Sequence, residues 1–265
     1  MSVAGPPQGA KAPLGGSAAA QAASVGAGMN TAADAALRDA LAAGARRLAF
    51  DLTDEQSRRL LDYLGLIQRW NKVYNLTAVR DPAEMLTHHL LDSLAVVGPL
   101  RRQLAGAQAG QPGLSIAQGP VKLLDVGAGA GLPGVVIAIC CPEISVTCVD
   151  TVAKKAAFIQ QVAAALRLPN LRGLHARVET LDARRDGGYD VVSSRAFASL
   201  ADFTTWSRAA LKGGEGPGVW MAMKGRHPAD EIATVPADVD VFHVEQLAVP
   251  GLDAERCLVW LRAKP

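Results

Sequence analysis

The sequence lacks the features that mark a membrane-embedded, disulfide-stabilised or zinc-dependent protein. No apolar run reaches the length of about eighteen residues that a membrane-spanning helix needs. Four cysteines show no C-x-x-C spacing, and three of them fall in apolar segments: Cys140, Cys141, Cys148 and Cys257. Such cysteines are typical of reduced residues in the core of a protein in a reducing compartment. We therefore expect a soluble, cytoplasmic protein without a metal site.

Targeting signals and a strong net charge are also missing. Residues 1–33 are mostly Ala, Gly, Ser, Gln and Pro, with Lys11 as the only charge, so they offer too little apolar surface to fold. They have neither the arginines of a transit peptide nor the leucine-rich core of a secretory signal. We expect a disordered extension here. A net charge of +2 gives no general attraction to nucleic acid, so an RNA-binding surface would require the fold to gather basic residues on one side.

The whole chain contains 49% apolar residues, which is enough for the core of one α/β domain with a small appendage. Helical spacing of apolar residues, a capping box at Thr53 and Gln56, and a helix start at Asp81 predict a helical cap over residues 34–103. A Gly- and Gln-rich stretch predicts a loop over residues 104–120.

Residues 121–265 alternate between strand and helix patterns. The segments VKLLDV, SVTCVD, GLHARV, YDVVSS and GVWMAMK read as strands, with helices between them, which predicts an α/β domain with a mostly parallel sheet. The last two patterns, DVDVFHVEQLAV and RCLVWLRA, are separated by PGLDAE and read as a hairpin. A plain dinucleotide-binding fold does not usually end in this way.

A glycine-rich turn, LLDVGAGAGLPG, joins the first strand to the first helix of this domain. Gly127, Gly129 and Gly131 allow a ligand close to the backbone, but residues 129–134 also match the G-x-G-x-x-G pattern of nicotinamide-binding folds. Asp125 favours S-adenosylmethionine, because a carboxylate suits an ammonium and a sulfonium group. Asp150 ends the next strand, where an acid binds ribose hydroxyls of either cofactor. A nicotinamide-dependent oxidoreductase therefore remains an alternative.

Three further segments contribute candidate residues. After the third strand, an adenine would lie against Val178, with Glu179 beside it. Arg195 ends the fourth strand at the carboxyl edge of the sheet, where open α/β folds bind ligands. His88, His89 and Asp92 share a predicted helix, and we expect a hydrogen bond on the helix surface there rather than a metal.

Missing motifs narrow the chemistry. No Pro-Cys nucleophile follows the fourth strand, as methylation of a pyrimidine carbon would require, and no Asp/Asn-Pro-Pro-aromatic motif is present for an exocyclic amine. The methyl acceptor should therefore need little activation. Guanine N7 is such an acceptor, because its lone pair attacks a methyl group without first losing a proton.

Several long motifs in order resemble one known family from about residue 35 to the end. These motifs are WNKVYNLTAVRDPAEMLTHHLLDSL, LLDVGAGAGLPG, CVDTVAKKAAFIQQV, HARVETL, SSRAFASL and MAMKGRHPADEI. The family is the bacterial 16S ribosomal RNA guanine-N7 methyltransferases, also called glucose-inhibited division protein B. The resemblance implies a class I S-adenosylmethionine-dependent methyltransferase: an α/β, Rossmann-like seven-stranded sheet with an antiparallel terminal hairpin and a small N-terminal helical cap.

The resemblance also implies the activity, which is N7 methylation of the guanine conventionally numbered 527 in 16S rRNA, in the small ribosomal subunit. It implies cofactor contacts at Gly127, Leu132, Val178, Glu179 and Arg195. Basic positions of the family fall on four residues that we expect to contact phosphates: Arg80, Lys154, Lys155 and Lys224. Arg195 is the candidate for positioning, and no catalytic side chain is assigned. We expect a monomer.

Two alternatives from other classes stay open on the sequence. One is the nicotinamide-dependent oxidoreductase, which depends on the offset glycine pattern and Asp150. The other is a non-catalytic RNA-binding module that has kept the methyltransferase fold.

Overall fold

The computed structural model describes residues 32–108, 120–213 and 218–264. Most of the expected N-terminal extension and most of the expected loop, residues 109–119, lie outside these described residues. No helix among the described residues is long and apolar enough to cross a membrane.

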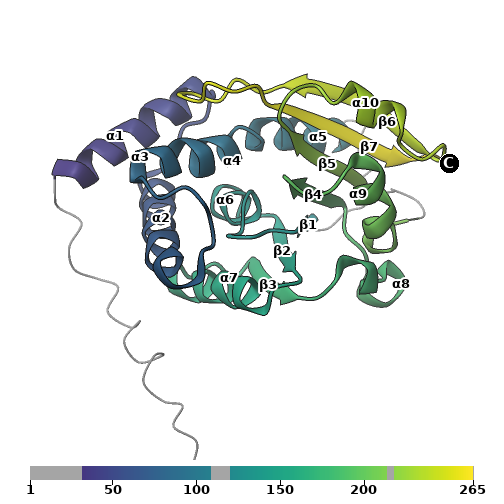
Figure 1. The fold of residues 1–265 in the computed structure, drawn as a ribbon, viewed down its shortest axis with the longest axis horizontal. Coiled ribbons are helices and arrows are strands. Elements are labelled where there is room, and N and C mark those ends of the chain that lie inside the picture. The colour runs from purple at the N-terminus through teal and green to yellow at the C-terminus, as the bar shows by residue number, and fades with distance from the viewer. Residues whose placement is uncertain (1–31, 109–119, 214–217, 265) are drawn as a thin grey trace, which may run out of the picture.

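A seven-stranded sheet forms the centre of the molecule (Figure 1), in the order β3-β2-β1-β4-β5-β7-β6. The strands are β1 Lys122–Val126, β2 Ser145–Asp150, β3 Leu171–His175, β4 Val191–Arg195, β5 Val219–Lys224, β6 Val239–Gln246 and β7 Cys257–Ala263. The first five pair in parallel, whereas β7 runs antiparallel to both β5 and β6. The predicted α/β sheet with a terminal hairpin is confirmed.

Helices cover both faces of this sheet, because its strands are apolar on both sides. The helices of this region are α6 Gly134–Cys140, α7 Ala153–Ala165, α8 Ala183–Asp186, α9 Leu200–Ser207 and α10 Ala229–Ala233, with single 3-10 turns η3 Val178–Thr180 and η4 Arg208–Ala210. In β1, Leu123 packs into one apolar cluster and Leu124 into the other. The short helices α8 and α10 did not show in the sequence pattern.

The N-terminal cap consists of helices that pack on α6 and α7 (Figure 1). Its elements are α1 Ala32–Arg47, α2 Asp54–Tyr74, α3 Pro82–Met85, the π-helical turn η2 Leu86–Leu91, α4 Asp92–Leu94 and α5 Val97–Gln108. The capping box of Thr53 and Gln56 and the Asp81 cap are both present, as the sequence predicts. Cap residues and sheet-covering helices share one apolar cluster, so the cap is part of the main core.

The boundary after the cap differs from the expectation. Residues 104–108 continue helix α5 instead of beginning the predicted loop. The physical reason is that Leu100 is fully buried and Leu104 packs against the same apolar cluster one turn later. This apolar spacing outweighs the glycines that suggested a loop.

Candidate active site

The glycine turn after β1 has the backbone that only glycine adopts readily. Gly127, Gly129 and Gly131 have φ angles of +64°, +59° and +92°. A Cβ atom on Gly129 would meet only the carbonyl oxygen of Gly127 within 4 Å, at 3.9 Å, so the absent side chain leaves open space. A Cβ atom on Gly127 would instead lie 2.5 Å from the ring of Phe197. The turn therefore leaves room for a ligand at Gly129.

Asp125 lies beneath this turn, and its assignment to the cofactor stays a prediction. Its side chain is fully buried. One carboxylate oxygen accepts a hydrogen bond from the backbone N–H of Gly134 at 3.0 Å, and the other accepts one from the Ser193 hydroxyl at 3.0 Å. The physical reason is strand alternation, which turns Asp125 towards the start of α6. Asp125 thus ties β1 and β4 to the helix that follows the turn.

The charge of Asp125 bears on the nicotinamide alternative. Burial raises its pKa to about 6, so the group is mainly ionised at pH 7. A dinucleotide-binding fold uses the amides at the start of this helix to bind a pyrophosphate. Here the first helical amide is already taken by a buried negative charge, which would repel a second anion. The geometry disfavours a dinucleotide.

Asp150 ends β2 and braces the turn from the neighbouring strand. Its carboxylate accepts hydrogen bonds from the backbone N–H groups of Gly129 at 3.0 Å and Val152 at 2.9 Å. Lys155 Nζ lies 3.7 Å from the same carboxylate. A carboxylate accepts several hydrogen bonds, so these contacts are compatible with an additional ribose hydroxyl. Its assignment to the cofactor stays a prediction.

Val178 and Glu179 lie in the turn η3 after β3, at the same edge of the sheet. Val178 is buried, whereas the Glu179 side chain is 35% exposed. Its own backbone N–H and the guanidinium of Arg177 lower the pKa of the Glu179 carboxyl, so the group is an acceptor at neutral pH. Both residues lie in the turn after β3, as expected from the sequence. Their contact with an adenine stays a prediction.

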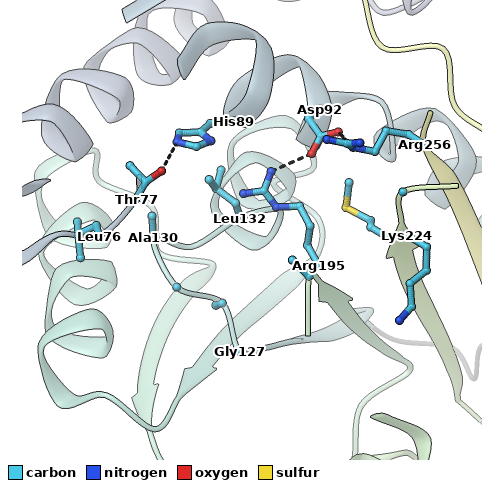
Figure 2. Close-up of a pocket in the computed structure, with 15 residues that line it drawn as sticks. Leu76, Thr77, His89, Asp92, Gly127, Ala130, Leu132, Arg195, Lys224 and Arg256 are labelled. Atoms are coloured by element: carbon cyan, nitrogen blue, oxygen red, sulfur yellow. Dashed lines mark hydrogen bonds and ion pairs between the residues drawn. The ribbon is translucent and has the colours of Figure 1, made fainter. Parts of the chain in front are cut away.

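A cavity of about 500 Å³ opens between the glycine turn and the cap (Figure 2). It lies at the carboxyl ends of β1, β4 and β5, where the chain crosses over in opposite directions and open α/β sheets bind ligands. The lining residues are Leu76, Thr77, His89, Asp92, Gly127, Ala128, Gly129, Ala130, Leu132, Arg195, Ala196, Met223, Lys224, Gly225 and Arg256.

Arg195 reaches across this cavity to the cap. Its Nη1 donates to Asp92 Oδ2 and to the backbone carbonyl of His88, both at 2.8 Å. Arg256, just before β7, donates from Nε to the other oxygen of Asp92 at 2.8 Å. Figure 2 shows the carboxylate between the two guanidinium groups. The Asp92 side chain is only 2% exposed, so the arginines hold it as a desolvated charge.

The residues of this bridge were only partly foreseen. His88, His89 and Asp92 were expected to hydrogen-bond among themselves on a helix surface, but Asp92 and the His88 carbonyl take Arg195 instead. Arg256 gave no sequence signal, because it lies more than 160 residues from Asp92 and no local spacing connects them.

The cap makes a hydrogen bond to the glycine turn, and another within itself, that no short-range pattern reveals. The Tyr63 hydroxyl of α2 donates to the carbonyl of Ala130 at 2.6 Å in a fully buried contact. Thr77 Oγ1 lies 3.0 Å from His89 Nε2 (Figure 2). Burial lowers the pKa of His89 to about 4, so its ring is neutral at pH 7. Thr77 and His89 of the cap thus form a polar, uncharged part of the cavity wall, apart from the charged Asp92.

The four candidate phosphate contacts lie in different surroundings. Arg80 and Lys154 are exposed, and Lys155 is half-buried beside Asp150. Lys224 differs from the expectation, because its ammonium donates to Glu231 at 2.7 Å and to the Ala198 carbonyl at 3.0 Å, and its side chain is 14% exposed. In Figure 2 this ammonium points away from the Asp92 bridge. Lys224 is a structural ion-pair partner rather than a free cation.

Comparison with known proteins decides which family these residues represent. The family model described as rRNA small subunit methyltransferase G matches residues 56–259. The chain belongs to this family. A curated relative in Acidovorax sp., named ribosomal RNA small subunit methyltransferase G, is 64% identical over 88% of this chain and 99% of its own length. One of the same name in Polaromonas sp. is 66% identical over 84% of this chain and 92% of its own length.

As a member of the rRNA small subunit methyltransferase G family, the chain is an S-adenosylmethionine-dependent methyltransferase. The residues present fit this cofactor. Gly129 leaves open space where a side chain would stand, and Asp150 lies at the adjoining strand end. The buried charge of Asp125 at the start of α6 suits a cationic ligand better than a pyrophosphate. Fold, family and cofactor therefore agree.

Proposed function

We propose that this protein transfers the methyl group of S-adenosylmethionine to N7 of a guanine in 16S ribosomal RNA, the guanine conventionally numbered 527. The chemistry of the cavity lining carries the proposal. Among its lining residues there is no cysteine, and the only carboxylate, Asp92, is neutralised by two arginines. Guanine N7 needs neither a nucleophilic side chain nor a general base, because it loses no proton in the reaction.

The cofactor would lie across the carboxyl ends of the first four strands. The cavity-lining residues Gly127, Gly129, Leu132 and Arg195 support a methionine end in the cavity, next to the cap. Asp150, Val178 and Glu179 support an adenosine end over β2 and β3. Asp125 would act from beneath, by fixing the turn and by its charge.

The bound cofactor supplies an electrophilic methyl group on a positively charged sulfur. The residues of this chain then have to align the guanine and exclude water. Because the positive charge moves from sulfur to N7 while the total is unchanged, no side chain has to accept a proton. Arg195 has a fixed orientation, because its Nη1 donates both to Asp92 Oδ2 and to the His88 carbonyl. This favours a positioning role.

The partner would be the small ribosomal subunit, bound by one copy of the chain in the cytoplasm. Arg80, Lys154 and Lys155 are the candidates for phosphate contacts, because rRNA binding must neutralise a charged backbone. The ion pair of Lys224 with Glu231 argues against including that residue.

The proposal is tested by incubating the protein with methyl-labelled S-adenosylmethionine and small ribosomal subunits that lack the modification. We expect label in 16S rRNA at about one methyl group per particle. No transfer under conditions in which a known homologue modifies the same particles would refute the proposal. Free 16S rRNA is included as a second substrate, to show whether the assembled particle is required.

The same preparation separates the two alternatives. Calorimetry should detect binding of S-adenosylmethionine and no binding of NAD(H), whereas an oxidoreductase would give the reverse. If the protein were a non-catalytic RNA-binding module, Arg195→Ala would change only the retention of RNA. We expect Arg195→Ala to lower methyl transfer at saturating particle concentration.

A further inference from the structure

The C-terminal end of α2 exposes apolar side chains that the fold does not cover. Val73 is 71% exposed and Tyr74 is 38% exposed. Among the described residues, Trp206 on α9 is the only other large apolar side chain with comparable exposure, at 40%. Asn75 ends the helix in a left-handed conformation, so Tyr74 occupies the last helical position. Val73 and Tyr74 are neighbours, and contiguous exposed apolar side chains mark interaction sites more often than single ones do.

The Tyr74 ring is held from behind. It packs on Trp70 with ring centroids 5.0 Å apart, and Trp70 packs on Phe158 of α7 at 5.2 Å. Phe158 is fully buried, so this aromatic row connects the exposed ring to the core. A ring supported in this way loses little conformational entropy when a ligand stacks on it.

Lys154 places a positive charge beside the ring, and three further cations lie on α2 and after it. Arg69, Lys72, Arg80 and Lys154 are exposed, and none has a carboxylate partner among the described residues within ion-pair distance. Lys154 Nζ lies 5.9 Å from the centroid of Tyr74. A groove of about 410 Å³ between α2 and α3 is lined by Arg69, Lys72 and Arg80.

The acidic residues nearby do not cancel this charge. Asp81 uses its carboxylate to cap α3 by accepting from Ala83 and Glu84, and Asp62 pairs with Arg58. The carboxyl of Glu84 stands in the first turn of α3. Among the described residues, none of these carboxylates forms an ion pair with Arg80 or Lys154.

This surface adjoins the cavity. Leu76 and Thr77 line the cavity, and Tyr74 precedes Thr77 by three residues, which limits the separation of their Cα atoms to about 11 Å. Lys154 follows Asp150, which braces the glycine turn, by four residues. A nucleotide next to one whose base entered the cavity would therefore fall within reach of Tyr74.

We propose that Tyr74, with Lys154 beside its ring and Arg80 hydrogen-bonded to the adjacent Asn75, forms a platform on which an unpaired base of the RNA substrate stacks beside the cavity. The inference depends on the proposed function and names the form of RNA that the site accepts. Aromatic faces combined with free cations are typical of surfaces for single-stranded nucleic acid, whereas paired bases keep their faces inside the helix. The exposed Lys154 side chain moves from the ring to a phosphate when a base stacks.

The test compares Tyr74→Ala, Tyr74→Leu and Tyr74→Phe with small ribosomal subunits as substrate. We expect Tyr74→Phe to stay within twofold of the unchanged protein. The other two should raise KM for the particle by roughly five- to a hundredfold, the range for loss of one stacked base. The Kd for S-adenosylhomocysteine should stay constant. Phe242→Leu is the matched control, because that ring also has a cation over it, Arg262 at 5.1 Å, but lies on β6 at the far edge of the sheet.

Two results would overturn the proposal: a Tyr74→Ala variant with an unchanged KM, or a Tyr74→Leu variant that works as well as Tyr74→Phe, since leucine preserves apolar packing without an aromatic face. If Tyr74→Ala lowers the melting temperature, the Leu and Phe pair alone decides. Methylation by the unchanged protein in the same assay reports on the proposed function separately, so the two hypotheses fail in different ways.

Discussion

Asp125 is a fully buried carboxyl group, and its burial predicts a defined pH dependence of stability. Its pKa rises from 3.8 in the unfolded chain to about 6 in the folded one. Between these values the folded state keeps a proton that the unfolded state has lost. The free energy of unfolding therefore falls as pH rises from about 3 to about 7, by about 3 kcal/mol in total.

The comparison with Asp125→Asn measures this effect. Asparagine can still accept from the Gly134 N–H and donate to Ser193, but it does not titrate. In urea unfolding between pH 4 and 7, the unchanged protein should lose about 2 kcal/mol relative to the variant. Two curves that stay parallel across this range would show that Asp125 titrates normally.

A side chain at Gly129 should cost more in cofactor binding than in stability. An alanine there adopts a left-handed conformation at a cost of about 1 kcal/mol, and its methyl group enters the open space of the cavity. We expect Gly129→Ala to weaken binding of S-adenosylmethionine at least tenfold in calorimetry. Gly106→Ala in α5 is the control, because its added Cβ atom meets nothing within 4 Å and should leave cofactor affinity unchanged.

At the level of elements, the sequence predicted what depends on local periodicity. The strands, the glycine turn, the terminal hairpin and both helix caps follow from residue patterns a few positions apart. The contacts that join the elements did not, since the bridge from Arg195 through Asp92 to Arg256 and the bond from Tyr63 to Ala130 connect residues that are distant in sequence. The orientation of Asp125 was also missed, because strand ends do not reveal which face holds the polar partners.

The Asp92 bridge joins the cap to the sheet. Breaking this bridge should therefore lower both the stability of the protein and its affinity for the cofactor. Asp92→Asn leaves two largely buried guanidinium groups sharing one neutral acceptor, which should cost about 2–3 kcal/mol of unfolding free energy. Because Arg195 lines the cavity, cofactor affinity should fall as well. Asp62→Asn removes an exposed ion pair with Arg58 on α2 and should change stability by less than about 1 kcal/mol. Equal losses in both variants would contradict a role of the bridge in docking the cap.

Over the whole molecule, attraction to RNA depends on where the charges lie, because the net charge is only +2. Each phosphate contact by a free cation should make the logarithm of affinity fall by about 0.7 per tenfold increase in salt on single-stranded RNA. Lys154→Ala should therefore reduce the salt dependence of particle binding by about that slope. Lys224→Ala should leave the slope unchanged, because its ammonium is already paired with Glu231. The opposite result, a smaller slope for Lys224→Ala alone, would reverse the assignment of these two lysines.

The central claim is that this cavity methylates N7 of guanine, and chemical identification of the product tests it most directly. Reduction with borohydride followed by aniline cleaves RNA at N7-methylguanine and at no unmodified base. After reaction with small subunits that lack the modification, we predict one new cleavage site in 16S rRNA, at the guanine conventionally numbered 527. Methyl transfer without cleavage at any guanine, or cleavage spread over many guanines, would contradict the account.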